Sequence, residues 1–147
     1  MMDLKTIIAH ARDREYMTGV ERDDLRVKAT GEVFTPTALV QRTLDRMDQT
    51  MFSDPDKTFL DPSCGDGQFL VAVKWVKVLF HGMTESEALN DIYGIDLMRD
   101  NVDLCKKRLG GGTILMGDSL HPEKRIKDQT NAEHNELLKL FTTTVFV

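Results

Sequence analysis

Hydrophobic positions along the chain change their spacing in a repeated order, from short continuous runs to positions three or four residues apart. Short runs are typical of buried strands, and the wider spacing is typical of one face of a helix. Strand and helix therefore alternate through much of the chain. The runs predict strands over residues 58–61, 92–95 and 113–116. The helical spacing predicts helices over residues 3–12, about 36–49, 68–81, 99–109 and 133–140.

Capping residues mark where two of the helices begin. Thr35 precedes Pro36, which is the usual order of an N-cap residue and a first-turn proline. In the segment TESE, Thr84 and Glu87 have the spacing of a capping box, in which each residue satisfies a free backbone N–H group of the first turn. A further short helix is therefore predicted to follow Thr84 and to end near residue 90.

The order of the elements indicates an α/β protein. Strands that alternate with helices form a mostly parallel sheet with right-handed crossovers and helices on its faces. Residues 141–147, FTTTVFV, are rich in β-branched and aromatic side chains and predict a fourth strand. Residues 12–28 are highly charged and indicate a loop or an exposed helix. We therefore divide the chain into an N-terminal helical and charged extension, residues 1–30, and one α/β domain, residues 31–147.

Composition narrows the possible classes of protein. A chain of 147 residues with 41% hydrophobic content suits a single globular domain. No apolar run approaches the about 18 residues of a membrane span, and the N-terminus is too charged for a secretory signal. We expect a soluble, cytoplasmic protein with no membrane partner. The net charge of -5 argues against a basic, nucleic-acid-binding surface over the whole molecule. Two cysteines and four scattered histidines, without metal-ligand spacing, predict no metal site.

The segment FLDPSCGDGQFL, residues 59–70, places an acid at the end of a strand and two glycines just beyond it. In a parallel sheet the ligand crevice lies outside the carboxyl ends of the strands, and glycines let a ligand approach the backbone there. The segment has neither the lysine of a phosphate-binding loop nor the third glycine of the dinucleotide fingerprint. A nucleoside triphosphate is therefore not expected.

Acidic residues follow the strands instead. Asp61, Asp96 and Asp118 lie at or just after the three strand ends, and Asp66 lies in the glycine-rich turn. Carboxylates repel a phosphate but suit a cationic or hydroxyl-rich ligand. Asp96 has the position at which an acid accepts hydrogen bonds from ribose hydroxyls, and Asp118 is placed to accept from an exocyclic amine. A nucleoside with a positive, non-phosphate group fits these features, and S-adenosylmethionine is such a molecule.

Four motifs in series carry a family resemblance. GEVFTP (residues 31–36), FLDPSCGDGQFL (59–70), IYGIDL (92–97) and ILMGDSL (114–120) resemble the cofactor half of the amino-group DNA methyltransferases. Those enzymes methylate adenine N6 and occur in restriction-modification systems and phages. The resemblance covers about residues 28–120 and implies a Rossmann-like methyltransferase fold, with a partial, mostly parallel sheet flanked by helices.

The resemblance also implies a binding site for S-adenosylmethionine. The residues implied at the methionine end of the cofactor are Phe34, Thr35 and Pro36. Those implied in the turn beneath it are Asp61, Pro62, Ser63, Cys64 and Gly65. Those implied at the ribose and adenine are Asp96, Leu97, Asp118 and Ser119.

One family motif is missing from the sequence. Enzymes of this family carry an Asp/Asn/Ser-Pro-Pro-aromatic loop after the fourth strand, which binds the target amine while the aromatic ring stacks on a flipped base. The chain has no Pro-Pro pair and no target-recognition region; its four prolines are Pro36, Pro55, Pro62 and Pro122. No catalytic residue is predicted. We expect catalysis to need a partner chain or a second copy, through which DNA would be bound.

Three functions stay open at this point. The first is a component of a DNA adenine methyltransferase. The second is a protein that binds S-adenosylmethionine without catalysis, as a sensor, competitor or remnant. The third is a methyltransferase for a small molecule or a protein. Several site residues also have plainer interpretations: Asp61 and Asp118 could be only helix N-caps, and Cys64 could be only a small residue in a tight turn.

Overall fold

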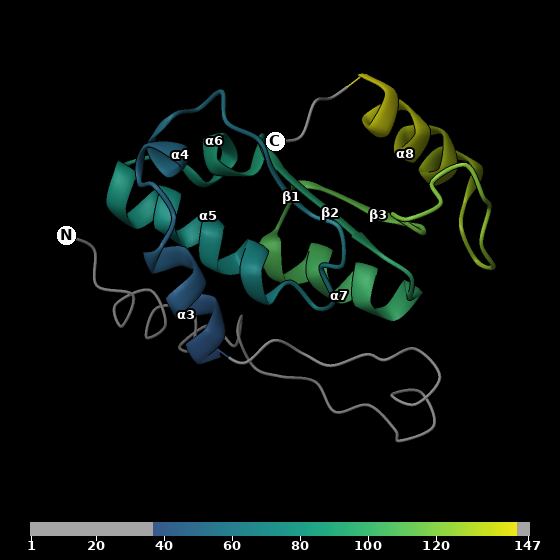
Figure 1. The fold of residues 1–147 in the computed structure, drawn as a ribbon, viewed down its shortest axis with the longest axis horizontal. Coiled ribbons are helices and arrows are strands. Elements are labelled where there is room, and N and C mark those ends of the chain that lie inside the picture. The colour runs from purple at the N-terminus through teal and green to yellow at the C-terminus, as the bar shows by residue number, and fades with distance from the viewer. Residues whose placement is uncertain (1–36, 144–147) are drawn as a thin grey trace.

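Three parallel strands form the centre of the protein. In the computed structural model, which describes residues 37–143, they are β1 (Phe59–Asp61), β2 (Ile92–Asp96) and β3 (Thr113–Met116), in the order β1-β2-β3 (Figure 1). The register pairs Asp61 with Gly94 and Asp96 with Met116. The carboxyl ends of all three strands therefore lie at one edge of the sheet.

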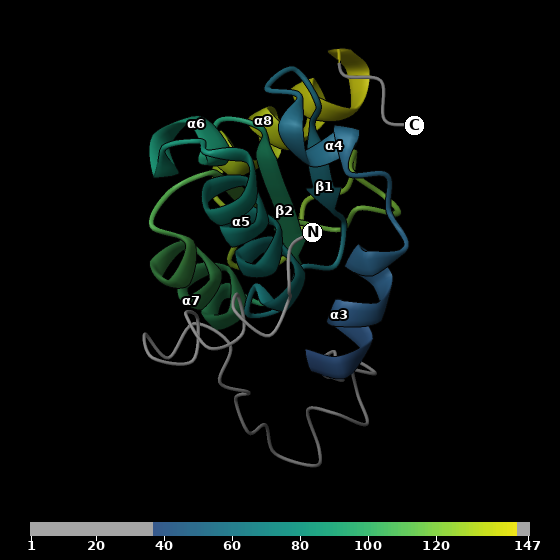
Figure 2. The ribbon, with the colours of Figure 1, turned by 90° about the vertical axis from the view of Figure 1, so that its left-hand side faces the viewer.

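Helices cover both faces of this sheet. They are α3 (Thr37–Asp45), α4 (Thr50–Ser53), α5 (Gln68–His81), α6 (Glu85–Leu89), α7 (Arg99–Leu109) and α8 (Asn131–Thr143). Helices α5 and α7 pack on one face, with α3 and α4 against α5, and α8 packs on the other face (Figures 1 and 2). This arrangement confirms the predicted α/β class with a parallel sheet flanked by helices.

The strands supply side chains to two separate cores, because successive residues of a strand point to opposite faces. Ile92 and Ile114 are buried with the α5 and α7 side chains. Ile95 and Leu115 are buried on the other face with Leu137 of α8 and its neighbours. Strands that are covered on both faces read as continuous hydrophobic runs, which is the pattern from which they were predicted.

Most predicted boundaries within the described residues are confirmed. Helices α5 and α7 and strand β3 begin and end at the predicted residues. Gly82 ends α5 in the left-handed conformation, with a φ of 66°. The Thr84 side chain accepts a hydrogen bond from Glu87 N at 3.1 Å, so the predicted cap begins α6.

The helix predicted over about residues 36–49 is shorter in the structure. Helix α3 ends at Asp45, where bonds such as Met47 N to Leu44 O at 3.2 Å tighten the chain into a turn. Asp48 then accepts a hydrogen bond from Thr50 N at 3.0 Å and starts α4. The short polar side chain competes with the helical backbone pattern, which the apolar spacing alone does not reveal.

The fourth strand predicted over residues 141–147 is wrong for residues 141–143, which form the end of α8. Phe141 packs with the same core as Leu137 and Leu140, so burial along one helical face overrides β propensity here. Residues 144–147, the helix predicted over residues 3–12 and the charged stretch 12–28 lie outside the described residues.

Helix α5 carries two buried lysines that hydrophobic spacing did not predict. Lys74 Nζ donates to Leu109 O at 2.7 Å and pairs with Glu85 at 2.9 Å. Lys77 Nζ lies 3.8 Å from an Asp91 oxygen, and burial lowers the pKa of this lysine. These contacts tie α5 to the end of α7 and to the start of β2.

Side chains cap the outer edge of β3. An edge strand presents unpaired backbone groups. Met116 N donates to Glu133 Oε2 at 3.0 Å, and Gln129 Nε2 donates to Met116 O at 2.8 Å. Glu133 also pairs with Arg99 of α7. Burial alone would raise the pKa of Glu133, but hydrogen bonds from Arg99, Met116 and Thr130 outweigh it and lower the pKa to about 2.

Replacing Glu133 by Gln should remove this link between β3, α7 and α8. The pKa of Glu133 is lowered on folding. Its contribution to stability is therefore present above pH 4.5 and is lost as the pH falls towards about 2. We expect E133Q to lower the free energy of unfolding at pH 7 by about 1.5–3 kcal/mol. The difference from wild type should shrink below pH 4.5.

Urea unfolding followed by circular dichroism at pH 7 and at low pH measures both effects. The matched control is Glu136→Gln, which removes an exposed carboxylate from the same helix and should leave stability unchanged. Equal stability of E133Q and wild type at pH 7 would contradict the assigned role of Glu133.

Candidate functional site

The turn between β1 and α5 depends on two glycines in the left-handed region. Gly65 has a φ of 55° and Gly67 a φ of 99°, values that L side chains rarely adopt. A Cβ added to Gly67 would lie 3.0 Å from Cys105 Sγ in α7. Gly67 N donates to Cys64 O at 2.9 Å and closes the turn. The turn is therefore tight, and it brings backbone rather than side chains to the carboxyl edge of the sheet.

A glycine in β2 makes room for this turn. A Cβ on Gly94 would lie 2.8 Å from Leu70 Cδ1, 3.0 Å from Ile114 Cδ1 and 3.1 Å from Cys64 Cβ. Cys64 N donates to Ile95 O at 2.9 Å, so the turn lies directly against β2. The motif IYGIDL contains Gly94, but its sequence gives no signal for this close packing.

Asp96 joins the turn to the start of α7. Its Oδ1 accepts a hydrogen bond from Gly65 N at 3.1 Å. Its Oδ2 accepts from Met98 N and from Asn101 Nδ2, each at 3.0 Å. An ionised carboxylate accepts about four hydrogen bonds, so these three donors occupy most but not all of its acceptor positions. Asn101 was not predicted as a site residue, because its contact with Asp96 depends on the bend between β2 and α7.

Asp61 at the end of the neighbouring strand is half-buried. Its Oδ1 accepts a hydrogen bond from Ser63 N at 3.1 Å. Burial raises the pKa of Asp61, the Ser63 hydrogen bond opposes that rise, and the nearby charge of Asp96 adds to it. A positive group close to Asp61 would offset the repulsion from Asp96.

The loop after β3 reaches the turn through Ser119. Its hydroxyl donates to Pro62 O at 2.8 Å, which brings together two of the predicted residues. Asp118 behaves differently, because its Oδ1 accepts from Leu120 N at 3.0 Å and so closes its own turn. Leu97, after β2, is 48% exposed and lies at the same edge of the sheet.

A cavity of about 640 Å³ opens beside Leu97, between the start of α7 and the loop that precedes α8. The apolar part of its wall consists of Leu97, Met98, Met116 and Ile126. Charged residues form the rest of the lining. A cavity that combines apolar and charged side chains can hold a small organic molecule. Of the predicted site residues that the structure describes, Leu97 alone lines this cavity.

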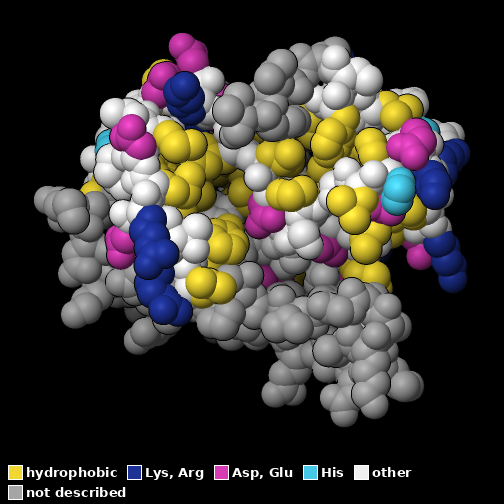
Figure 3. Space-filling view, in the orientation of Figure 1, with side chains coloured by type: hydrophobic (Ala, Val, Ile, Leu, Met, Phe, Trp, Pro, Cys, Tyr) yellow, Lys and Arg dark blue, Asp and Glu magenta, His cyan; other side chains and the backbone are white. Residues whose placement is uncertain are grey.

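The structure connects only some of the predicted site residues with one another. Hydrogen bonds connect Gly65 with Asp96 and Pro62 with Ser119, whereas the Asp118 side chain serves its own turn. Phe34, Thr35 and Pro36 lie outside the described residues. For each of these residues, contact with a cofactor stays a prediction. On the face drawn in Figure 3, acidic side chains lie in the recessed centre among hydrophobic ones.

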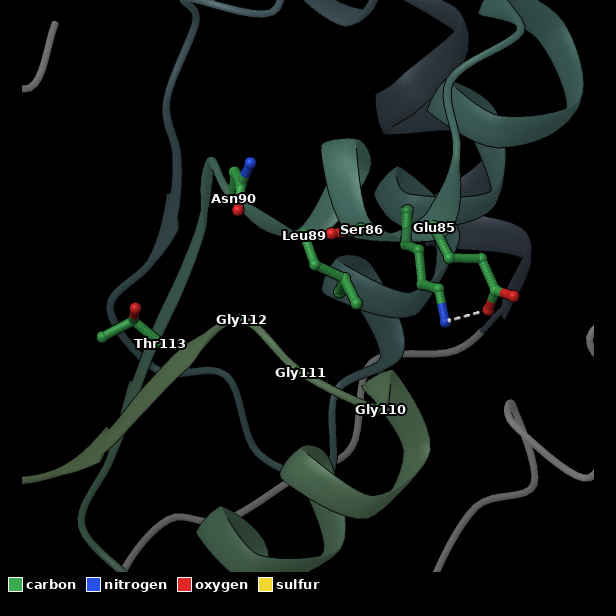
Figure 4. Close-up of a pocket in the computed structure, with 9 residues that line it drawn as sticks. Glu85, Ser86, Leu89, Asn90, Gly110, Gly111, Gly112 and Thr113 are labelled. Carbon is green, nitrogen blue, oxygen red and sulfur yellow. Dashed lines mark ion pairs between the residues drawn. The ribbon is translucent and has the colours of Figure 1, made fainter.

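A second cavity, of about 530 Å³, lies away from the predicted residues, near the start of β3 and beside α6. Its wall includes the glycine loop 110–112 and the ion pair between Lys74 and Glu85 (Figure 4). Residues 37–143 contain no cluster of three or more side chains suited to hold a metal ion. None of the helices in this part of the chain has the length and apolar character needed to cross a membrane.

Comparison with known proteins identifies the family. The family model described as N-6 DNA Methylase matches residues 23–134, so the chain belongs to the N-6 DNA methylase family. A comparison with curated proteins gives no match. The match confirms the resemblance carried by the four motifs and supports a DNA methyltransferase-like function. Enzymes of this family typically use S-adenosylmethionine as the methyl donor.

Replacing Gly94 by Ala should disturb the turn. The added Cβ overpacks the contact of β2 with Leu70 and Cys64, and we expect a loss of about 1–3 kcal/mol in stability. A hydrogen bond with Cys105 and burial raise the pKa of Cys64, so this thiol should react slowly with a disulfide reagent in the wild type. It should react faster in G94A.

The control is Gly82→Ala at the end of α5. That position is also left-handed, but no atom lies within 4 Å of the added Cβ. G82A should lose some stability through backbone strain and keep the slow thiol reaction. Wild-type stability and thiol reactivity in G94A would show that Gly94 does not support the turn.

Proposed function

We propose that this chain binds S-adenosylmethionine and forms the cofactor-binding half of a DNA adenine-N6 methyltransferase. One observation carries the proposal: the Asp96 carboxylate, at the end of the middle strand, is hydrogen bonded to Gly65 of the glycine turn and retains an acceptor position. An acid in this position, beside a turn that exposes backbone, suits the ribose of a nucleoside.

The charges of the site fit the cofactor. S-adenosylmethionine supplies a methyl group on a positively charged sulfur. Burial and Asp96 hold the pKa of Asp61 above its usual value, and a cation near the two carboxylates would lower their energy. The apolar wall of Leu97, Met98 and Met116 offers a surface for the adenine ring. Phe34, Thr35 and Pro36 would complete the methionine end.

The target amine needs other residues. Its nitrogen must be held by hydrogen-bond acceptors while it attacks the methyl group, and a flipped base must be stacked. The 147 residues contain no Pro-Pro pair with which the family performs this task. We infer that the residues that hold the adenine and contact the DNA lie outside these 147 residues, in a further segment or in a partner chain. A role in a restriction-modification system or a phage, in the cytoplasm, would follow from this assignment.

Cofactor binding can be measured by titration calorimetry with S-adenosylmethionine. We expect Asp61→Asn and Asp96→Asn each to weaken binding by about tenfold or more, because each removes a charged acceptor. The pKa of Asp61 is raised, so its carboxylate is charged above that pKa and neutral below it. Binding by the wild type should therefore weaken as the pH falls through the raised pKa. D61N should lack this part of the pH dependence.

The matched control for both variants is Asp56→Asn, which removes an exposed carboxylate from the turn before β1. D56N should bind as tightly as the wild type. S-adenosylhomocysteine, whose sulfur is neutral, should lose less affinity in D61N than S-adenosylmethionine does. A wild-type protein with no affinity for either nucleoside would overturn the proposed function.

A methyl-transfer assay distinguishes a component of a methyltransferase from a sensor that only binds the cofactor. We expect the purified chain alone to leave unmethylated plasmid DNA unchanged, since it lacks the loop that binds the amine. Addition of the products of neighbouring genes should produce N6-methyladenine, detected by mass spectrometry of the digested DNA. Methylation by the chain alone would contradict the inferred need for other residues. Tight binding without transfer in any combination would favour a non-catalytic role.

A further inference from the structure

A buried ion pair connects the glycine turn to the far end of α7. Asp66 lies between the two left-handed glycines and is 1% exposed. Its Oδ2 lies 2.6 Å from Nη1 of Arg108, which is 9% exposed. The Asp66 side chain therefore points into the protein rather than into the crevice above the strands. Neither residue belongs to the predicted cofactor site.

The pair is poorly arranged if stability is its only role. Asp66 Oδ2 accepts from Arg108 and, at 3.3 Å, from Gln68 Nε2, but its Oδ1 is buried with no hydrogen-bond partner. A buried charge costs free energy unless its hydrogen bonds are complete, and apolar replacements of buried ion pairs are often as stable or more stable. The arrangement therefore favours a role in geometry.

The geometry that it controls is that of the proposed cofactor site. Gly65, next to Asp66, donates its N–H to Asp96 Oδ1 at 3.1 Å. Two consecutive residues of the turn are thus held by different groups: Asp96 holds the backbone at Gly65, and Arg108 holds the side chain at Asp66. If the second contact is lost, the left-handed turn can shift and the Gly65 N–H can leave Asp96.

We propose that Arg108 is a positioning residue for the cofactor site. Through Asp66 it holds the turn in the position that keeps Gly65 bonded to Asp96, and so it fixes the direction of the carboxylate offered to the ribose. This inference rests on the proposed function. Arg108 touches no part of the cofactor itself, because its guanidinium is buried between α7 and the turn.

A double-mutant cycle tests the proposal. Asp66→Asn, Arg108→Gln and the double variant are compared with the full wild-type chain by calorimetry with S-adenosylmethionine, at a temperature where circular dichroism shows all four to be folded. Each single variant should weaken binding by about tenfold. The double variant should lose much less than the product of the two effects, because the residues act as one pair.

The matched control is the ion pair of Lys74 and Glu85, which also anchors α5 but lies away from the turn. Glu85→Gln should leave the dissociation constant unchanged, whatever it does to the urea midpoint. Arg108→Lys keeps the charge but loses the planar fork of the guanidinium, and it should bind more weakly than wild type and more tightly than R108Q.

The outcomes separate the two proposals. No binding by the wild type overturns the proposed function. Binding by the wild type, with unchanged affinity in folded D66N and R108Q, overturns the positioning role. If those variants do not fold, R108K decides: wild-type affinity overturns the role, and weaker binding with an unchanged circular dichroism spectrum supports it.

Discussion

The Asp96 carboxylate organises the carboxyl edge of the sheet. It accepts hydrogen bonds from Gly65, in the turn before α5, and from Met98 and Asn101, at the start of α7. A buried charge must be met by donors, and these donors come from segments that are more than thirty residues apart in the chain. The glycine turn, the middle strand and the next helix therefore take up one arrangement. The proposed site for ribose follows directly from it.

Charged side chains fix the helices around that centre. Lys74 and Arg108 are buried, and each joins two elements: Lys74 ties α5 to the end of α7, and Arg108 ties α7 to the turn. Glu133 closes the edge of β3 while it pairs with Arg99. Each of these contacts joins two elements that are far apart in the sequence, so together they fix how the helices are aligned on the sheet.

Family membership and the residues of the site both suggest that the cofactor and the target base are bound by different parts of the enzyme. The chain belongs to the N-6 DNA methylase family, and its described residues form a three-stranded parallel sheet at whose carboxyl edge the cofactor site is proposed. The sequence lacks the Pro-Pro segment that would hold the adenine amine. In the proposed function, binding of the methyl donor and selection of the base therefore depend on different residues.

Local patterns in the sequence predicted most of the helices and strands and an expected position for the site. Alternating hydrophobic periods located the strands and the long helices, since burial on one face or two faces leaves a local signature. The glycine turn and the acid at the end of β2 could also be predicted from the sequence. The conformational freedom of a glycine and the charge of an aspartate are properties of the single residue. The family motifs in turn indicated the cofactor.

Contacts between residues far apart in the sequence set the features that the sequence did not predict. Residues 141–143 extend α8 instead of starting a strand, because Phe141 finds the core beside Ile95 and Leu115. Asp118 closes its own turn, whereas Asp66 turns inward to meet Arg108. In each case local sequence patterns do not determine which contact the side chain makes. The choice is made by groups that only the folded chain brings within reach.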